Sequence, residues 1–69
     1  MKGFSFIESK SFSNSDIEYS IWRSKDNDLF CLCLGKSFMN KCFDPEPKII
    51  ITATDYKTIK NAFELIKTV

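Results

Sequence analysis

Residues 48–69, KIIITATDYKTIKNAFELIKTV, decide the fold, because they predict a short strand (Ile49–Ile51) that leads into one amphipathic helix. Thr54 or Asp55 is suited to cap the helix N-terminus with its side-chain oxygen. Beyond the cap, apolar residues recur at three- and four-residue steps and form one stripe: Tyr56, Ile59, Phe63 and Ile66, widened by Ala62, Leu65 and Val69. A helix of this length is marginal alone, so we expect it to pack on another element.

The rest of the chain predicts antiparallel strands for that helix to pack on. We expect strands at residues 3–8, 17–24, 29–34 and, as a short edge strand, 38–43. The predicted fold class is α+β, with an antiparallel sheet of four or five strands and one C-terminal helix on one face. Residues 1–69 form a single small domain in this interpretation.

Polar and strand-breaking residues separate these strands. Ser9–Asp16 contains four Ser and is expected to form a loop, because Ser, Asn and Asp side chains compete for backbone hydrogen bonds. Gly35-Lys36-Ser37 is expected to end the third strand. Asp44-Pro45-Glu46-Pro47 is expected to be an extended connector, since proline cannot donate to a sheet ladder.

The central hairpin allows a prediction of register. If Asp26 and Asn27 form its tip, Tyr19 faces Leu34 and Ile21 faces Leu32 on one side of the sheet. On the other side Trp22 faces Cys31 and Ser20 faces Cys33. The first side, which also includes Ile17 and Phe30, is expected to pack against the helix.

The second side of the hairpin carries Trp22 and has no helix to cover it. An exposed apolar patch centred on tryptophan is typical of an interaction site. We expect Trp22 to bind a partner or a second copy, making a homodimer, with Leu29, Phe38 and Phe43 nearby. The alternative is that residues 38–43 fold over this side.

Composition narrows the classes of function. Seven Phe, two Tyr and one Trp allow a small core to bury much apolar area, and the formal net charge is only +1. Weak net charge argues against nucleic-acid binding driven by overall charge. We expect a cytoplasmic protein without a membrane span, because no export signal or long apolar run is seen and the three Cys are an odd number. Richness in Lys, Ile and Asn is typical of AT-rich bacterial and phage genomes.

Catalytic and metal-binding signatures are weak. Cys31, Cys33 and Cys42 could provide three ligands, but structural zinc needs four and the chain has no His. The same absence removes the commonest general base for a cysteine nucleophile. The acidic residues are scattered, and we predict no enzyme activity, cofactor or metal.

Basic residues support an alternative function. The alternative is a dimeric module that binds single-stranded DNA or RNA. In it, sheet aromatics stack on exposed bases and five basic residues contact phosphates: Arg23, Lys25, Lys57, Lys60 and Lys67. The order of elements is similar to that of the transcriptional-coactivator and Whirly-type families, which bind single-stranded DNA. The similarity covers that order only, and no residues are carried over from it. Our first expectation is a non-enzymatic protein-binding module, such as a phage or bacterial inhibitor or adaptor.

Overall fold

The computed structural model describes residues 2–11, 16–38, 42–43 and 46–66. It contains strands β1 (Phe4–Ser11), β2 (Ile17–Ser24), β3 (Phe30–Phe38), β4 (Cys42–Phe43) and β5 (Lys48–Ala53), followed by helix α1 (Tyr56–Leu65). All strand pairs are antiparallel. The main sheet has the order β1-β2-β3-β5, and the short β4 pairs with the end of β3. The predicted α+β class is therefore confirmed.

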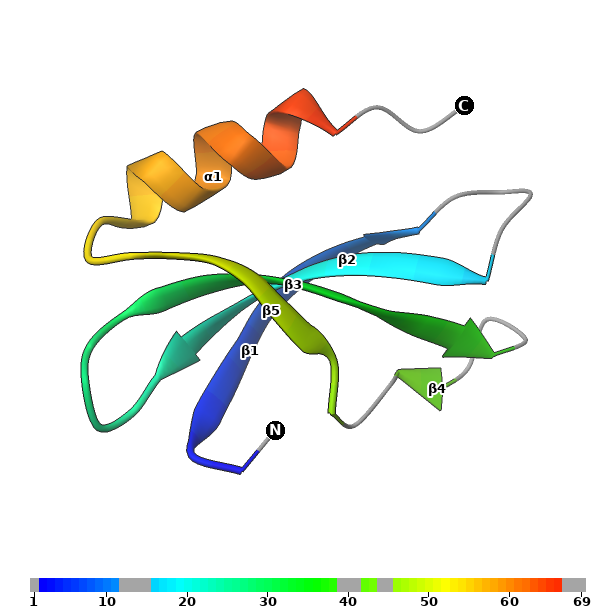
Figure 1. The fold of residues 1–69 in the computed structure, drawn as a ribbon, viewed down its shortest axis with the longest axis horizontal. Coiled ribbons are helices and arrows are strands. Elements are labelled where there is room, and N and C mark those ends of the chain that lie inside the picture. The colour runs from blue at the N-terminus through cyan, green and yellow to red at the C-terminus, as the bar shows by residue number, and fades with distance from the viewer. Residues whose placement is uncertain (1, 12–15, 39–41, 44–45, 67–69) are drawn as a thin grey trace.

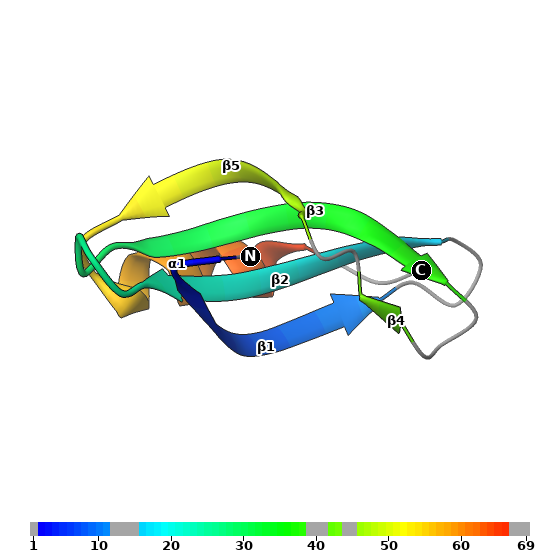
Figure 2. The same cartoon turned by 90° about the horizontal axis from the view of Figure 1, so that it is seen from below.

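Helix α1 covers one face of this sheet, and β4 lies on the side away from the helix (Figures 1 and 2). No helix in the described ranges is long and apolar enough to cross a membrane. The layer arrangement leaves β1 and β5 as the two outer strands of the main sheet.

The core lies between α1 and the two central strands. Ile21 and Leu32 from the sheet and Ile59 and Phe63 from the helix are buried together. Partly buried side chains from the apolar stripe of the helix and from the strands pack around this core: Tyr19, Phe30, Ala53, Tyr56, Ala62 and Ile66. Leu65, which the sequence placed at the margin of the apolar arc, is 78% exposed.

Asp55 caps the helix, as one of the two predicted candidates. Its Oδ2 accepts hydrogen bonds from the Thr58 backbone N–H and from Thr58 Oγ1, both at 3.0 Å. The described helix ends at Leu65, and Val69 and the other residues after Ile66 lie outside the described residues.

The predicted register of the central hairpin is confirmed. Tyr19 pairs with Leu34, Ile21 with Leu32 and Trp22 with Cys31. The tip is a turn in which Asp28 adopts a positive φ of 54°, a conformation that Asp tolerates better than most residues.

Three strands are longer than the sequence predicted, and one of them is β5, which spans Lys48–Ala53 rather than Ile49–Ile51. Ser9–Ser11 belongs to β1 rather than to the Ser-rich loop, because it pairs with the start of β2. The predicted break at Gly35-Lys36-Ser37 is wrong, since Gly35 and Lys36 pair with Glu18 and Ile17, and β3 continues to Phe38. Pairing with a long neighbouring strand outweighs the weak strand preference of a single glycine.

Candidate functional site

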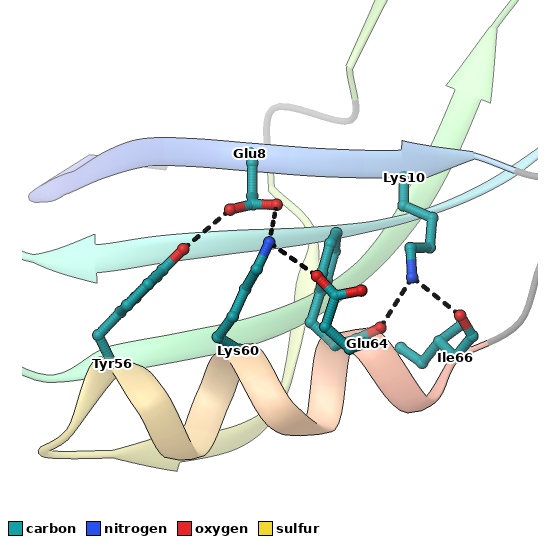
Figure 3. A network of polar contacts seen from close by, with 7 residues as sticks. Glu8, Lys10, Tyr56, Lys60, Glu64 and Ile66 are labelled. Carbon is teal, nitrogen blue, oxygen red and sulfur yellow. Dashed lines mark hydrogen bonds and ion pairs between the residues drawn. The ribbon is translucent and has the colours of Figure 1, made fainter.

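A polar network joins the outer strand β1 to the helix (Figure 3). Glu8 accepts hydrogen bonds from the Tyr56 hydroxyl at 2.9 Å and from Lys60 Nζ at 2.6 Å. Lys60 also contacts the carboxylate of Glu64 at 2.9 Å. Lys10 Nζ donates to the carbonyl oxygens of Phe63 and Ile66, both at 2.9 Å.

Lys10 thus supplies donors to carbonyl groups at the helix C-terminus, where the helix dipole favours a positive charge. The Lys10 ammonium group also lies 4.6 Å from the centre of the Phe63 ring. The Lys60 ammonium group lies 5.3 Å from the centre of the same ring. The network therefore fixes the helix against β1 through charge-assisted contacts at its margin.

A β-bulge at Ile7 makes this network possible. Phe6 pairs with Trp22, but Glu8 pairs with Ile21, so Ile7 is an extra residue in β1. Successive residues of a regular strand point to opposite faces, and regular alternation would place Glu8 and Phe6 on the same face. With the bulge, Phe6 points away from the helix and Glu8 points toward it.

The network sets the protonation of its members. Hydrogen bonds from Lys60 and Tyr56 lower the pKa of Glu8, and the bond to Glu8 raises the pKa of Tyr56. The bonds to Glu8 and Glu64 raise the pKa of Lys60. Near neutral pH these groups hold their ordinary charges more firmly, which suits a structural role.

The opposite face of the sheet carries the predicted interaction residue Trp22. Trp22 is half-buried, and its Nε1 donates to Ser20 Oγ at 2.8 Å. The Phe6 ring packs edge-on against it, with centroids 5.4 Å apart and an interplanar angle of 78°. Phe6 is 42% exposed. We call this pair, Phe6 and Trp22, the aromatic rim.

The centre of this face is covered within the chain itself. Ser20, Cys31 and Cys33 are buried, and β4 lies on this side of the sheet (Figure 1). The centre of this face is therefore not open to a partner. The aromatic rim at the β1 side is an accessible part of this face.

The thiols on this face are protonated and enclosed. Burial raises the pKa of Cys31, and burial together with the neighbouring Cys31 raises the pKa of Cys33 to about 12. Thiols with raised pKa values are poor nucleophiles at neutral pH. In the described part of the chain, no group of three His, Cys, Asp or Glu residues is placed to hold a metal ion.

The other predicted partner-binding residues lie at the two ends of β3. Leu29 is half-buried just before β3, and its carbonyl accepts from the Ser24 N–H at 2.7 Å. Phe38 is the last residue of β3 and Phe43 is the last residue of β4. The C-terminal end of β3 pairs with β4. Their side chains lie outside the described part of the structure.

The predicted nucleic-acid residues do not form one free basic surface. Arg23 is engaged in an ion pair with Asp28, and Lys60 is paired with two carboxylates. Lys25 and Lys57 are exposed, at the hairpin tip and on the helix. Lys67 lies outside the described residues.

A second apolar surface, which the sequence analysis did not single out, lies on β5. Ile49, Ile50 and Ile51 are 40%, 44% and 41% exposed. A run of three isoleucines reads from sequence as a buried strand, and alternation does not reveal whether a strand is central or at an edge. We call this surface, Ile49–Ile51, the isoleucine edge.

Comparison with known proteins gives no further guide to function, since no protein-family model, curated protein or solved structure matches the chain.

Proposed function

We propose that this chain is a small non-enzymatic protein-binding module that engages a partner protein through the aromatic rim. The observation that carries the proposal is the edge-on pairing of a 42% exposed Phe6 with the half-buried Trp22. Aromatic anchors of this kind dominate many interfaces because they bury a large apolar area with few rotatable bonds.

The rim is also held in position before any partner arrives. The indole N–H of Trp22 already has an acceptor in Ser20, so a partner need not supply one. The neighbouring Phe6 limits the motion of the indole. A surface that is already ordered loses less conformational entropy on binding, which favours affinity.

An inhibitor or adaptor in a bacterium or phage is the specific role that we favour. The chain is small, and its amino-acid composition is typical of AT-rich bacterial and phage genomes. The raised pKa values of Cys31 and Cys33 favour a binding role over a catalytic one. A cytoplasmic location belongs to the proposal, because the two described cysteines are free thiols.

Site-specific photo-crosslinking tests the proposal. A photoreactive phenylalanine analogue replaces Phe6 in one variant and the 78% exposed Leu65 in a control variant. Position 6 is expected to capture a discrete foreign protein from bacterial cells, and position 65 is not. Equal capture at both positions, or none at position 6, would contradict the proposal.

A binding measurement with the captured protein completes the test. Phe6→Ala is expected to weaken binding at least ~30-fold, as expected for truncating an aromatic hot spot. Circular dichroism verifies that the variant is folded. Unchanged affinity in a folded Phe6→Ala variant would remove the aromatic rim from the interface.

Nucleic-acid binding, the alternative from sequence, has less support because Arg23 and Lys60 are already ion-paired. Fluorescence anisotropy with a labelled single-stranded oligonucleotide separates the two proposals. Affinity that falls steeply with added salt would favour phosphate contacts, whereas no binding at low salt would end this alternative.

A further inference from the structure

The outer edge of β5 is exposed and apolar. β5 pairs with β3 along one edge, and among the described residues no strand pairs with its other edge. Its three isoleucines are each about two-fifths exposed. An apolar edge strand offers unpaired backbone groups and side chains to another strand, so it is a ready surface for strand addition.

The devices that usually prevent such pairing are sparse in β5. Of its six residues only Lys48 is charged, and it stands at the start of the strand. A bulge at Ile50 bends the strand, since Leu32 pairs with Ile51 and Cys33 pairs with Ile49. The bulge nevertheless adds a third isoleucine to the exposed surface.

The charges at the two ends of β5 identify a fitting partner. Lys48 begins the strand, and the exposed Asp55 follows two residues after its end. Antiparallel pairing of β5 with an identical strand brings each Lys48 toward the Asp55 of the other copy, whereas parallel pairing would place like charges together. A net charge of +1 adds little long-range repulsion between copies.

We infer that β5 pairs antiparallel with β5 of a second copy of this chain. A two-fold axis perpendicular to the sheet relates the copies, so the same surface contributes twice. The main sheets join into one continuous sheet with both helices on the same side. This inference goes beyond the proposed function, because it uses the isoleucine edge rather than the aromatic rim.

Solution mass as a function of concentration tests the inference directly. Light scattering after size-exclusion chromatography is expected to show wild type approaching twice the 8.0 kDa monomer mass. Ile50→Lys places a charge at an exposed edge position and is expected to raise the dimer dissociation constant at least ~30-fold. Leu65→Lys, at another exposed apolar position, is the matched control and should behave as wild type.

The charge pattern is tested separately. Lys48→Glu is expected to weaken the dimer by roughly 2- to 30-fold, because a negative charge then lies at the end of the strand that meets the Asp55 end of the other copy. Lys2→Glu changes the net charge equally at an exposed site near β1, and should leave the dimer unchanged. Asp55→Asn keeps a good helix N-cap and is expected to weaken the dimer less than Lys48→Glu.

Each result bears on one surface. Wild type that stays monomeric at every concentration, or a dimer that a folded Ile50→Lys variant retains, overturns the β5 dimer. Phe6→Ala should preserve the dimer while it loses the foreign partner. Failure of the aromatic-rim proposal would therefore leave the solution mass unaffected, and the two ideas fail independently.

Discussion

The two outer strands of the sheet, β1 and β5, contain the same local device with different consequences (Figure 2). Each strand has one extra residue, Ile7 in β1 and Ile50 in β5, opposite a regular neighbour. In β1 the residues after the bulge are Glu8 and Lys10, and both bind the helix. In β5 the residues around the bulge are isoleucines that remain partly exposed.

This difference shows that a bulge does not by itself place charge on an outer strand. In β1 the bulge is followed by charged side chains that contact the helix. β5 has no charged residue after Lys48, so its edge stays apolar. We therefore expect changes in β1 to affect folding stability and changes in β5 to affect association.

The largest expected effect is the loss of folding stability when Ser9 is deleted from β1. Deleting Ser9 makes Glu8 and Lys10 neighbours in the strand, so they can no longer both point toward the helix, because side chains alternate along a strand. The helix contacts of one of the two are lost, and we expect the free energy of unfolding to fall by about 2–4 kcal/mol. Urea denaturation measures this loss.

Deleting Ile7 is the matched control for that experiment. Without the extra residue, Phe6 still points toward Trp22 and Glu8 still points toward the helix, now by regular alternation. We expect a loss below about 1.5 kcal/mol, since Ile7 is 37% exposed. Equal losses from the two deletions would show that the faces of β1 do not explain its stability.

A smaller effect is expected from Lys10→Met, which keeps most of the apolar stem and removes the ammonium group. The Phe63 and Ile66 carbonyls lose a charged hydrogen-bond donor, and we expect the free energy of unfolding to fall by about 1–3 kcal/mol. Lys25→Met, in the exposed turn, should change stability by less than about 0.5 kcal/mol. A similar result for both variants would mean that Lys10 contributes no specific contact.

Sequence reasoning succeeded where the signal is local. The hairpin register follows from strand alternation and a turn rich in Asp and Asn, and pairs such as Ile21 with Leu32 were predicted correctly. The helix stripe and the Asp55 cap follow from three- and four-residue spacing and from capping chemistry. These features depend on residues that are close in the chain.

The remaining features depend on pairing between distant residues. Both bulges fall at isoleucines, which are ordinary strand residues, so the sequence does not indicate where a bulge occurs. The contacts of Glu8 and Lys10 with the helix could therefore not be predicted. The continuation of β3 through Gly35 depends on its pairing with Glu18. The exposure of Ile50 depends on β5 being an outer strand, which periodicity does not reveal.

The smallest effect, and the most specific to the β1 network, is the pH dependence that Glu8 confers. Its pKa is lowered in the folded protein, so the carboxylate stabilises the fold above the pKa of an unfolded glutamate, ~4.3. That contribution is lost as the pH falls through the lowered pKa of the folded state. Glu8→Gln keeps the shape of the side chain and removes the charge that Lys60 contacts.

Urea denaturation of wild type and Glu8→Gln between pH 7 and pH 2.5 measures this contribution. The stability advantage of wild type should be present at pH 7 and should shrink as the solution is acidified below about pH 4.3. Asp16→Asn, at an exposed position, controls for the loss of one carboxylate. An advantage that stays constant through this range would show that contacts other than the Glu8 charge hold β1 to the helix, and the contrast between the two edges would then depend on Lys10 alone.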